Sequence, residues 1–544
     1  MIADFPADGV LPEHDICVVG SGPAGLALAL ACAAQGQRVI VLESGGERPA
    51  PDTAELGRAS IADVRRHAPM ETASARALGG SSHWWGGRCV PFDPVDFSTR
   101  PYAPDAAWPI AFEELAAWAE PAAAFLGCGP AKFRAVSSNW DRLRGASFDR
   151  LERWTPRNNL SQVHAESLRT AANLTVFLHA TVCGLKLSRS GACVEALEVA
   201  ANGGRRQVRS PRFVLACGGI ETTRLLLATQ RDNPTAFGGR DGPLGRYYMG
   251  HLSGKIANLV LSDPADVRLH DFVLDQGVYE RRRLSLTDDV LNGQQLLNIS
   301  FWADNPAFHD PQHRNALLSL TWLGLAIPAV GRRLLPEAVR QSHLGPRPRR
   351  VWPHVRNVLA DPVGAALQVT TVLRERYLKS PRKPGFLLRN RSGRYALHYH
   401  AEQAPSATSR ITLTDDCDAT GLPRASIALE FRQEDASSVV RAHESLDASL
   451  RDAGLGSLEF HTTDSSWSRS VLDQASDGIH QLGSTRMAAQ GKPGVVDRDC
   501  RVQGVDNLYI ASSSVFPSSG QANPTYLLVM LALRLAAHLG ALDA

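Results

Sequence analysis

The chain has 544 residues, of which 44% are hydrophobic and 21% are charged, and its formal net charge is only +3. This composition is typical of a globular protein with two or three domains, and it excludes an intrinsically disordered chain. The small net charge gives no reason to expect nucleic acid as a partner. The nine cysteines are scattered without a C-x-x-C pair, which favours a reducing compartment over a disulfide framework and offers no clustered metal ligands.

Neither a signal peptide nor a membrane span is predicted. Residues 1–15 are acidic and lack the cationic start and apolar run of a signal peptide. The most apolar stretch, 316–331, is shorter than the roughly 20 residues that a membrane-spanning helix requires, and it contains Pro328. We interpret this stretch as a buried helix or a covering lid in preference to a membrane contact. The expectation is a cytoplasmic protein without stable membrane insertion.

A strand, a glycine-rich turn and a helix are predicted near the N-terminus. The β-branched run Ile16–Val19 leads into an Ala/Leu-rich helix, and a second strand, 38–42, ends at Glu43. Three glycines lie at the turn in the spacing G-x-G-x-x-G: Gly20, Gly22 and Gly25. In such a unit the glycines allow a tight turn, admit a pyrophosphate and let helix and strand pack closely, and the helix N-terminus favours the phosphate charge. Because the Glu43 carboxylate can accept hydrogen bonds from ribose hydroxyls, FAD or NAD is expected rather than NADP.

A second glycine-rich stretch, residues 78–93, brackets a histidine and two tryptophans. Glycine is used where the backbone passes close to another group or adopts a positive φ angle. Two large aromatic side chains held between such turns indicate a flat partner. The residue types alone do not specify whether His83 contacts that partner, bonds to it or fills space.

The elements that follow are less regular. A polar, tryptophan-bearing helical region is predicted over about 101–169, and alternating residues predict strands over 173–187 and 192–200. A further strand–turn–helix unit is predicted over 210–230, with two glycines at its junction.

The middle of the chain, about 249–470, is expected to be rich in strands and loops and contains no such units. Its arginine-rich section, 332–383, is interpreted as the charged face of a covering helix. Nucleotide-binding units at both ends and a dissimilar middle predict a discontinuous cofactor domain interrupted by a substrate domain. The expected division is 10–100, 170–260 and 470–544 for the cofactor domain, and 101–169 and 261–469 for the substrate domain with a helical cover.

The C-terminal region predicts a strand, then a loop rich in Ser, Gly and Pro that ends at Asn523 before an apolar helix. Pro524 suits the first turn of that helix, and the helix onset directs free N–H groups and a positive dipole end at whatever lies in front. His480 is predicted to lie on a turn before a Gly/Ser/Thr/Arg run. Taken alone, His480 could be a buried histidine with both ring nitrogens hydrogen-bonded, and Asn523 could be an ordinary N-cap. The residue pattern therefore leaves their catalytic role open.

Several motifs together resemble those of the glucose–methanol–choline (GMC) oxidoreductase family, with the closest likeness to its bacterial sugar-oxidising, pyranose-oxidase-like branch. The motifs are VVGSGPAG…LES, GGSSHWWGG, VLACGGIETTRLLL and HQLGSTRM…NLYIASSSVFPSSGQANPT, in this order. The match covers about 1–100, 170–260 and 470–544, and the middle of the chain matches only loosely.

The resemblance implies an α/β fold, with a Rossmann-like FAD-binding domain of the GMC type and an inserted α+β substrate domain built on an antiparallel sheet. In the family, a histidine at the His480 position is the base that takes the hydroxyl proton. The residue at the Asn523 position orients the same oxygen while the hydride passes to flavin N5. Imidazole has a suitable proton affinity near neutral pH, and an amide can donate to an alkoxide without competing for the proton.

The resemblance also implies which residues contact FAD, and no residue is expected to bind a metal. The expected FAD contacts are Gly20, Gly22, Pro23, Ala24, Gly25, Glu43, Gly79, Gly80, Ser81, Ser82, Trp85, Gly86, Val182, Ala216, Ser513, Pro524 and Thr525. Some members of the family attach the flavin through a histidine directly before the tryptophan of the second glycine loop. Here Trp84 precedes Trp85 and His83 lies one residue earlier, so we expect non-covalent FAD.

The expected function is FAD-dependent oxidation of CH–OH to C=O in a sugar, glycoside, aminoglycoside-like compound or other polyol, with His480 as base. Two alternatives stay open: oxidation of an apolar alcohol such as a sterol, for which 316–331 would suit as a lid, and a flavin-binding protein without turnover. The motifs do not specify the electron acceptor, whether oxygen, a quinone or a carrier protein. If His480 is not the base, His398 and His400 are the next candidates, because their alternating segment predicts a strand with both imidazoles on one face.

Overall fold

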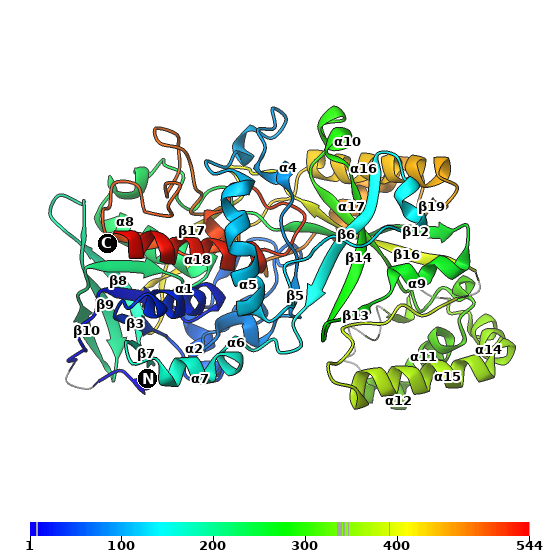
Figure 1. The fold of residues 1–544 in the computed structure, drawn as a ribbon, viewed down its shortest axis with the longest axis horizontal. Helices are drawn as coiled ribbons and strands as arrows, with labels where there is room; N and C mark the ends of the chain where they lie inside the picture. The colour runs from blue at the N-terminus through cyan, green and yellow to red at the C-terminus, as the bar shows by residue number, and fades with distance from the viewer. Residues whose placement is uncertain (7–8, 335–339, 341–342, 346–347, 391, 543–544) are drawn as a thin grey trace.

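The computed structural model describes the whole chain except residues 7–8, 335–339, 341–342, 346–347, 391 and 543–544. Figure 1 shows an elongated molecule, with a parallel sheet and its helices in one half and an antiparallel sheet in the other. A group of helices lies below the antiparallel sheet in this view, away from the parallel sheet.

Six parallel strands form the parallel sheet, in the order β1–β7–β3–β2–β11–β20. Their bounds are β1 (Ile2–Asp4), β2 (Ile16–Val19), β3 (Val39–Leu42), β7 (Leu174–Leu178), β11 (Arg212–Leu215) and β20 (Leu508–Ile510). The central strands β2 and β3 are buried at every residue, because a parallel sheet with both faces covered needs continuous apolar runs. The sheet joins segments from both ends of the chain.

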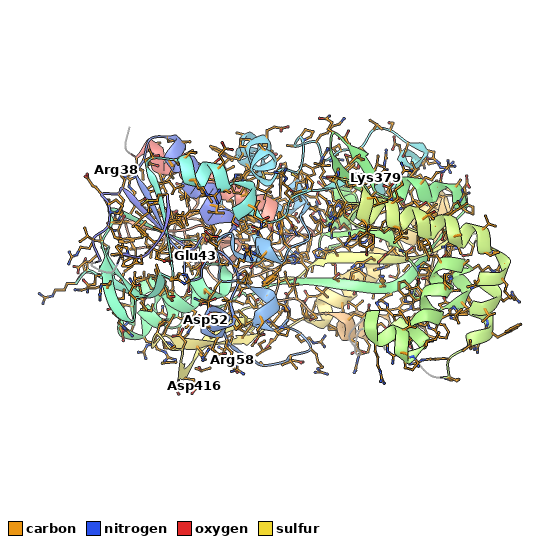
Figure 2. The ribbon with its side chains drawn as sticks, turned by 90° about the horizontal axis from the view of Figure 1, so that it is seen from below. Arg38, Glu43, Asp52, Arg58, Lys379 and Asp416 are labelled. Carbon is orange, nitrogen blue, oxygen red and sulfur yellow. The ribbon has the colours of Figure 1, made fainter. Side chains whose placement is uncertain are left out.

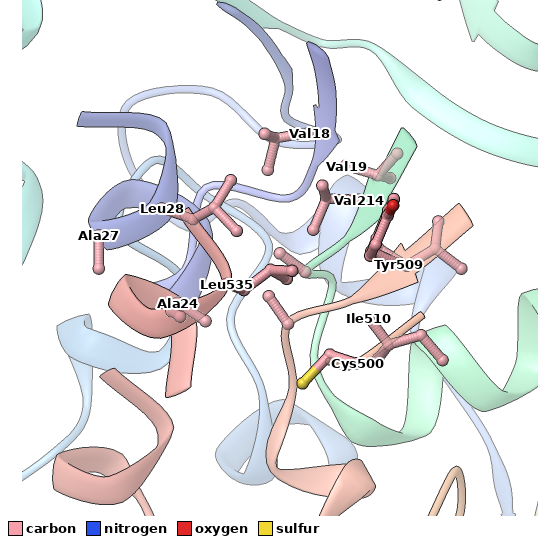
Figure 3. Close-up of a cluster of buried hydrophobic side chains, with 14 of the residues drawn as sticks. Val18, Val19, Ala24, Ala27, Leu28, Val214, Cys500, Tyr509, Ile510 and Leu535 are labelled. Atoms are coloured by element: carbon pink, nitrogen blue, oxygen red, sulfur yellow. The ribbon is translucent and has the colours of Figure 1, made fainter. Parts of the chain in front are cut away.

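Two helices far apart in sequence, α1 (Pro23–Ala34) and α18 (Thr525–Ala541), pack against each other beside this sheet. Figure 3 shows the core that they share with the strands. Its labelled side chains include Val18, Leu28, Val214, Ile510 and Leu535. Truncation of one of the larger side chains to alanine would leave a cavity between segments from the two ends of the chain. Such substitutions typically lower the free energy of unfolding by about 2–5 kcal/mol.

The antiparallel sheet has its main path in the order β19–β12–β16–β15–β14–β6–β5, and β13 pairs with β14. The strands are β5 (Arg88–Cys89), β6 (Ala146–Trp154), β12 (His251–Leu261), β13 (Val273–Asp275), β14 (Val278–Leu286), β15 (Ile299–Asp304), β16 (Arg394–Glu402) and β19 (Gly456–Phe460). One face of the sheet is apolar and packs against α16 (Gln433–Asp452), as Leu284, Phe301, Leu397 and Leu446 illustrate. The other face carries polar side chains, which are described below with the site.

Two small sheets complete the strands. One is formed by β8 (Thr181–Leu187), β9 (Val194–Ala201) and β10 (Gly204–Val208), and the other by β4 (Ser60–Ile61), β17 (Arg410–Cys417) and β18 (Pro423–Ala428). The second small sheet packs against α8 (Gly219–Asp232) through Ile220, Ile411 and Ile427.

The predicted helical region 101–169 is only partly helical. Its helices η3 (Phe112–Trp118) and α5 (Ala119–Leu126) precede β6, a nine-residue strand within the antiparallel sheet, and the short helices α6 (Leu160–Val163) and α7 (Ala165–Thr170) follow it. The strand segment, ASFDRLERW, carries four charged residues. They mask its alternation, because two of them, Glu152 and Arg153, are buried.

The prediction of a middle made of strands and loops is wrong for residues 433–452. These residues form α16, a 20-residue helix. Its buried apolar residues recur at helical spacing, at Val439, Ala442, Leu446 and Leu450, but the polar residues between them keep the segment's average hydropathy low. The periodicity was the usable signal.

The sheets also divide the chain differently from the expected domain ranges. Strand β12 belongs to the antiparallel sheet although most of it falls in the range 170–260. Conversely, Trp108, Leu115 and Leu126 pack in the core around the parallel sheet although they fall in 101–169. Local alternation predicts a strand but does not tell which sheet it joins, because strand partners are distant in sequence.

The described residues between 316 and 383 form a helical unit below the antiparallel sheet (Figure 1). Its elements include α11 (Ala316–Ala326), α12 (Pro328–Leu334), α14 (Val351–Ala360), α15 (Pro362–Leu373) and η8 (Arg374–Leu378). The apolar stretch 316–331 is thus interrupted before Pro328, and α11 has a buried side that includes Leu318, Trp322 and Leu325. Part of the arginine-rich section lies outside the described residues. No helix of the described part of the chain is long and apolar enough to cross a bilayer.

Candidate active site

A cavity of about 470 Å³ lies where the carboxyl ends of the parallel strands meet the loops before α8 and α18. It is lined by every residue predicted to contact FAD or to act in catalysis, except Gly25 and Gly79. The outer edge of a parallel sheet at its carboxyl end is where open α/β folds bind their ligands. The structure therefore gathers residues from positions 20 to 525 into one site.

The first glycine loop joins β2 to α1 and leaves room for a ligand. Gly20 has φ +98°, and a Cβ atom there would lie 2.7 Å from the Ala216 carbonyl oxygen. A Cβ atom on Gly25 would lie 2.0 Å from the Gly20 carbonyl oxygen, so Gly25 serves the close packing of helix and strand and does not reach the cavity. By contrast, a Cβ atom on Gly22 would meet only that same Ala216 oxygen, at 4.0 Å. The free space beside Gly22, at the helix N-terminus, fits a pyrophosphate.

Glu43 lies at the end of β3 in the interior of the molecule, as Figure 2 shows, and only 5% of its surface is exposed. Its Oε2 atom accepts hydrogen bonds from the backbone N–H of Ser21 (3.0 Å) and from Ser21 Oγ (2.5 Å), and Oε1 accepts from the Gly45 N–H (2.9 Å). A carboxylate offers about four acceptor positions, so Glu43 retains capacity for a ribose hydroxyl. It also ties the first glycine loop to β3.

The second glycine loop packs directly on the first. Gly79 has φ +95° and precedes the short helix η1 (Gly80–His83). A Cβ atom on Gly80 would lie 2.8 Å from Gly22 Cα, so only glycine permits this approach. The loop then presents Trp84 and Trp85 to the cavity.

His83 does not line the cavity. Its Nε2 atom lies 2.9 Å from the Leu78 carbonyl oxygen, and its Nδ1 atom lies 3.3 Å from the amide nitrogen of Asn159. Both ring nitrogens therefore have partners within the protein, and an imidazole held in this way has no free nitrogen for a bond to a flavin.

The loop before α18 brings His480 and Asn523 together at the cavity. Pro524 caps α18, and its carbonyl accepts from the Leu528 N–H. Ser513 donates to the carbonyl of Gln481, the residue after His480, at 2.8 Å. The Asn523 amide nitrogen lies 3.0 Å from His480 Nε2. Asn523 Oδ1 is buried and has no hydrogen-bond partner among the described residues, which leaves an acceptor for a bound ligand.

Two residues that the sequence analysis missed hold His480 from behind. Asp477 Oδ2 lies 3.1 Å from His480 Nδ1, and His251 Nδ1, on β12, lies 3.0 Å from the same atom. Burial alone would raise the pKa of Asp477, but the adjacent His480 and His251 hold it well below its usual range. Asp477 precedes His480 by three residues, so its position was a usable signal. His251 is distant in sequence and gave none.

Hydrogen-bond partners assign the protons of this cluster. His251 Nε2 lies 3.1 Å from the Ser519 carbonyl oxygen, which can only accept, so this nitrogen carries a proton. Burial lowers the pKa of His251, and its Nδ1 atom also lies 3.3 Å from Asp477 Oδ2. Because a carboxylate only accepts, the proton of a neutral His480 lies on Nδ1, 3.1 Å from Asp477 Oδ2, and the electron pair of His480 Nε2 faces the donating Asn523 amide. His480 Nε2 can therefore accept a proton from a hydroxyl group.

The alternative bases His398 and His400 lie on one face of β16, as their alternation predicted. His400 stacks on His251 with ring centroids 4.3 Å apart, and its Nδ1 donates to the Gln521 carbonyl at 2.8 Å. Burial holds the pKa of His400 well below its usual value. His398 stacks on Trp302 and is bonded to Ser253 at 2.8 Å. Neither residue lines the cavity.

Three histidines, His251, His400 and His480, each have one ring nitrogen that could bind a metal ion, and these nitrogens lie within 4.8 Å of one another. The sequence gave no sign of this juxtaposition, because the residues come from three distant segments. Carbonyl groups occupy one nitrogen each of His251 and His400, and Asp477 occupies one of His480. The cluster is thus satisfied as a hydrogen-bond network, and the absence of a metal stays a prediction.

The polar face of the antiparallel sheet adds a group of buried charges beside this cluster. Arg88, Arg281 and Arg283 surround one carboxylate, that of Glu152, and Arg88 lines the cavity. Burial would raise the pKa of Glu152, but the arginines hold it below its usual range. Burial lowers the pKa of Arg88 to about 10, against the opposing effect of Glu152. Three cations sharing one anion leave this side of the site with an excess of positive charge.

Comparison with known proteins agrees with this arrangement. Residues 15–249 match the family model "FAD dependent oxidoreductase", and residues 405–532 match the C-terminal family model "GMC oxidoreductase". A curated relative, 2-methyl-1,2-propanediol dehydrogenase from Mycolicibacterium austroafricanum, is 22% identical over 96% of this chain and 94% of its own length.

Two solved structures share the fold over nearly their whole length. Pyridoxine 4-oxidase from Mesorbium loti has a TM-score of 0.54 and 17% identity, and the match covers 97% of this chain and 99% of the other. Formate oxidase from Aspergillus oryzae has a TM-score of 0.52 and 15% identity, with 97% and 98% covered. At these identities the likeness shows the fold alone.

The fold and the cavity define a flavoprotein of the oxidoreductase class. The two family models give this chain an FAD-dependent oxidoreductase region over residues 15–249 and a GMC oxidoreductase C-terminal region over residues 405–532, so the chain is an FAD-dependent oxidoreductase that acts on alcohols. The predicted family, α/β fold and cofactor are therefore confirmed. The matches support the family and do not resolve the sugar-oxidising branch.

Proposed function

We propose that this enzyme oxidises a hydroxyl group of a polar, polyol-like alcohol to a carbonyl group, with His480 as the base. The observation that carries the proposal is the free electron pair on His480 Nε2, which faces the Asn523 amide at 3.0 Å inside the cavity. When bound, FAD supplies the acceptor for the hydride of the carbinol carbon.

The chain's own residues would act on one oxygen atom. A substrate hydroxyl that replaces the direct hydrogen bond between the two side chains donates its proton to His480 Nε2, and the Asn523 amide donates to the same oxygen as negative charge develops. Asp477 accepts from His480 Nδ1 and favours the imidazolium that forms. Asp477 is a positioning residue, because it touches His480 and does not line the cavity.

Charge and polarity beside the cavity bear on the substrate class. Of the charged side chains on the adjacent sheet face, Arg88 lines the cavity, and its guanidinium is costly to bury against an apolar ligand. This favours a sugar, glycoside or other polyol over a sterol. The excess positive charge of Arg88, Arg281 and Arg283 favours a neutral or anionic polyol over a cationic, aminoglycoside-like one. The relative that acts on 2-methyl-1,2-propanediol is named for a small diol, which is also in this class.

FAD is proposed to bind without a covalent bond. Support comes from His83, whose two ring nitrogens are hydrogen-bonded away from the cavity. Acid precipitation of the purified protein should release free FAD into the supernatant. Yellow colour that stays in the washed, denatured pellet would contradict non-covalent binding.

The function is tested by anaerobic mixing of the purified holoenzyme with sugars, glycosides, polyols, aminoglycosides and sterols while the flavin absorbance is followed. We expect bleaching by members of the polyol class and not by sterols. Bleaching by sterols alone would favour the apolar alternative, and no bleaching by any alcohol would favour a flavin-binding protein without turnover. Reoxidation of the bleached enzyme with oxygen, a quinone or a carrier protein then identifies the electron acceptor.

A further inference from the structure

The helical unit, residues 316–383, differs from the rest of the chain in charge. It contains twelve arginines and lysines and three acidic residues, a net charge of +9, whereas the whole chain carries +3. The remaining residues therefore carry −6. So large an asymmetry gives the molecule one basic end, and it orients the molecule in the field of a charged surface.

The same unit exposes apolar side chains. More than half of the exposed large hydrophobic side chains of the described residues lie between positions 320 and 378, in about a tenth of the chain. They are Leu320, Ile327, Val330, Val351, Trp352, Leu359, Val363, Leu367, Leu373, Tyr377 and Leu378. Single exposed hydrophobics are ordinary, but a gathering of this size marks an interaction site.

The spacing of these residues on α14 and α15 places arginines among them. On α14, Trp352, Arg356 and Leu359 lie at i, i+4 and i+7, which is one face of a helix. On α15 and the turn after it, Val363, Leu367 and Arg374 follow at i, i+4 and i+11, again one face. Trp352 is 71% exposed, Leu359 69% and Leu367 63%.

The inner faces of these helices are already satisfied by contacts within the unit. His354 of α14 is buried and stacks on Trp322 of α11 with ring centroids 4.0 Å apart. Trp322 and Leu325 of α11 pack with Leu344 in a small core of their own. The exposed apolar residues therefore lie outside this small core.

Several of the described cations on this surface are not neutralised within the unit. Glu375 pairs with Lys379 (2.5 Å), and Lys383 pairs with Asp271, which lies outside the unit (2.6 Å). Arg350, Arg356, Arg374 and Arg382 have no acidic partner within 4.0 Å among the described residues. Figure 2 shows Lys379 on the half of the molecule that holds these helices, away from Arg38 and Glu43.

We propose that the helical unit docks this enzyme on the surface of an anionic lipid bilayer. Short helices with aromatic and aliphatic side chains on one face and arginines among them lie in the plane of a membrane interface. Anionic headgroups attract the +9 unit and repel the −6 remainder, which turns this end toward the bilayer. The helices, of 10 and 12 residues, are too short to cross it, so the association is peripheral and reversible.

The test is flotation of the purified holoenzyme with vesicles of phosphatidylcholine alone or with about a third of phosphatidylglycerol. The account predicts flotation with the anionic vesicles at low salt, with a partition coefficient at least tenfold lower on neutral vesicles. Raising the salt to screen charge beyond a few ångströms should release most of the bound protein. Equal binding to both vesicle types, or no binding to either, would overturn the proposal.

Two sets of substitutions separate the contributions. Arg350→Gln, Arg356→Gln and Arg374→Gln together should lower the partition coefficient on anionic vesicles by roughly 10²-fold, since each surface cation contributes about fivefold. Trp352→Ser with Leu359→Ser should lower it at low salt as well. Val273→Ser with Leu274→Ser, exposed residues on β13 outside the unit, is the matched control and should float like the unmodified protein.

The alternative that a second copy of this chain covers the surface is tested by the oligomeric state in solution. Light scattering coupled to size exclusion, without lipid, should give a monomer for both the unmodified enzyme and Leu359→Ser. A dimer that Leu359→Ser and Leu367→Ser convert to monomer would mean that a second copy covers this face, and the membrane proposal would then fall. Unchanged flavin content and melting temperature in each variant verify that the fold is intact.

Discussion

The two sheets of this enzyme are specified in different ways. The parallel sheet is buried on both faces, and its strands β2 and β3 are continuous apolar runs followed by a glycine turn and an acid. The antiparallel sheet buries one face against α16 and carries arginine, glutamate and histidine on the other. The parallel sheet offers its proposed FAD site backbone groups and one carboxylate, whereas the antiparallel sheet contributes side chains from strands far apart in sequence.

This difference locates the chemistry at the junction of the two sheets. His480 comes from a loop beside the parallel sheet, whereas His251, which contacts it from behind, belongs to β12 of the antiparallel sheet. Substitutions on the cofactor side should therefore change FAD retention without changing turnover of loaded enzyme. Substitutions at the junction should lower turnover without changing FAD retention.

The largest effect is expected at the proposed base. His480→Ala should lower the rate of anaerobic flavin reduction by about 10²–10⁴-fold, the usual contribution of a positioned acid–base group. Asn523→Ala should lower the same rate less, because a base remains. Both act on one oxygen, so the double variant should lose less than the product of the two. FAD content should stay unchanged in all three, and multiplicative losses would show that the residues act independently.

The next largest effect is expected at Asp477. In Asp477→Asn the amide can donate to His480 Nδ1, which moves the imidazole proton to Nε2 and removes the free electron pair there. Flavin reduction should slow by roughly 10²-fold or more, as expected when an imidazole is held in the wrong tautomer. Asp477→Glu, which keeps a carboxylate, should recover part of the rate. Equal losses in the two variants, with equally lowered melting temperatures, would indicate a structural role only.

On the cofactor side, Glu43→Ala should weaken FAD binding and leave the chemistry intact. Loss of a charge-assisted ribose hydrogen bond corresponds to roughly 1.5–3 kcal/mol, or about 10–10²-fold in the dissociation constant. Glu43→Gln keeps hydrogen-bonding capacity and should bind with intermediate affinity. The measurement is fluorescence titration of the apoprotein with FAD. If Glu43→Ala bound FAD normally, the carboxylate would not be at the ribose.

The smallest effect concerns stability at low pH and a histidine remote from the site. His270 is buried between Trp140 and Phe148, neither ring nitrogen has a hydrogen-bond partner among the described residues, and burial lowers its pKa to about 3. The unfolded chain, with an ordinary value of about 6.5, binds a proton that the folded chain excludes, so stability present above pH 6.5 is lost as pH falls.

For that reason, the free energy of unfolding should fall by about 2 kcal/mol less in the His270→Phe variant than in the unmodified enzyme when the pH is lowered from 7 to 5. Urea unfolding at both pH values measures the difference. Parallel losses in the two proteins would show that His270 is protonated in the folded state or solvated there. Flavin reduction should be unchanged, because His270 is not part of the site.

The same contrast explains how much of the molecule could be predicted from its sequence. The glycine loops and Glu43 could be predicted to share a site because each lies in a short motif whose spacing reflects a local backbone requirement. His480 and Asn523, which the family resemblance suggested, line the same cavity. Gly20, Gly25 and Gly80 leave no room for a side chain, so their types are dictated nearby. The α/β fold followed from the same units, because strand, turn and helix are contiguous there.

The antiparallel half could not be predicted to the same depth. Strand β6 was missed because its buried Glu152 and Arg153 look like surface residues until their partners on neighbouring strands are known. His251 was missed because its contact with His480 spans 229 positions. The expected boundary near residue 260 does not coincide with the edge of a sheet for the same reason, since β12 and β16 pair across β13, β14, β15 and the helical unit. Long-range pairing, not weak propensity, limits what a single sequence reveals here.

The central claim is that one cavity oxidises a carbinol with His480 taking the hydroxyl proton. It is tested most directly by anaerobic stopped-flow mixing of a bleaching alcohol, unlabelled or deuterated at the carbinol carbon, with unmodified enzyme and His480→Ala. The account predicts that deuteration slows bleaching in the unmodified enzyme and that His480→Ala is slower by about 10²–10⁴-fold with FAD still bound. Bleaching of His480→Ala at the unmodified rate would contradict it.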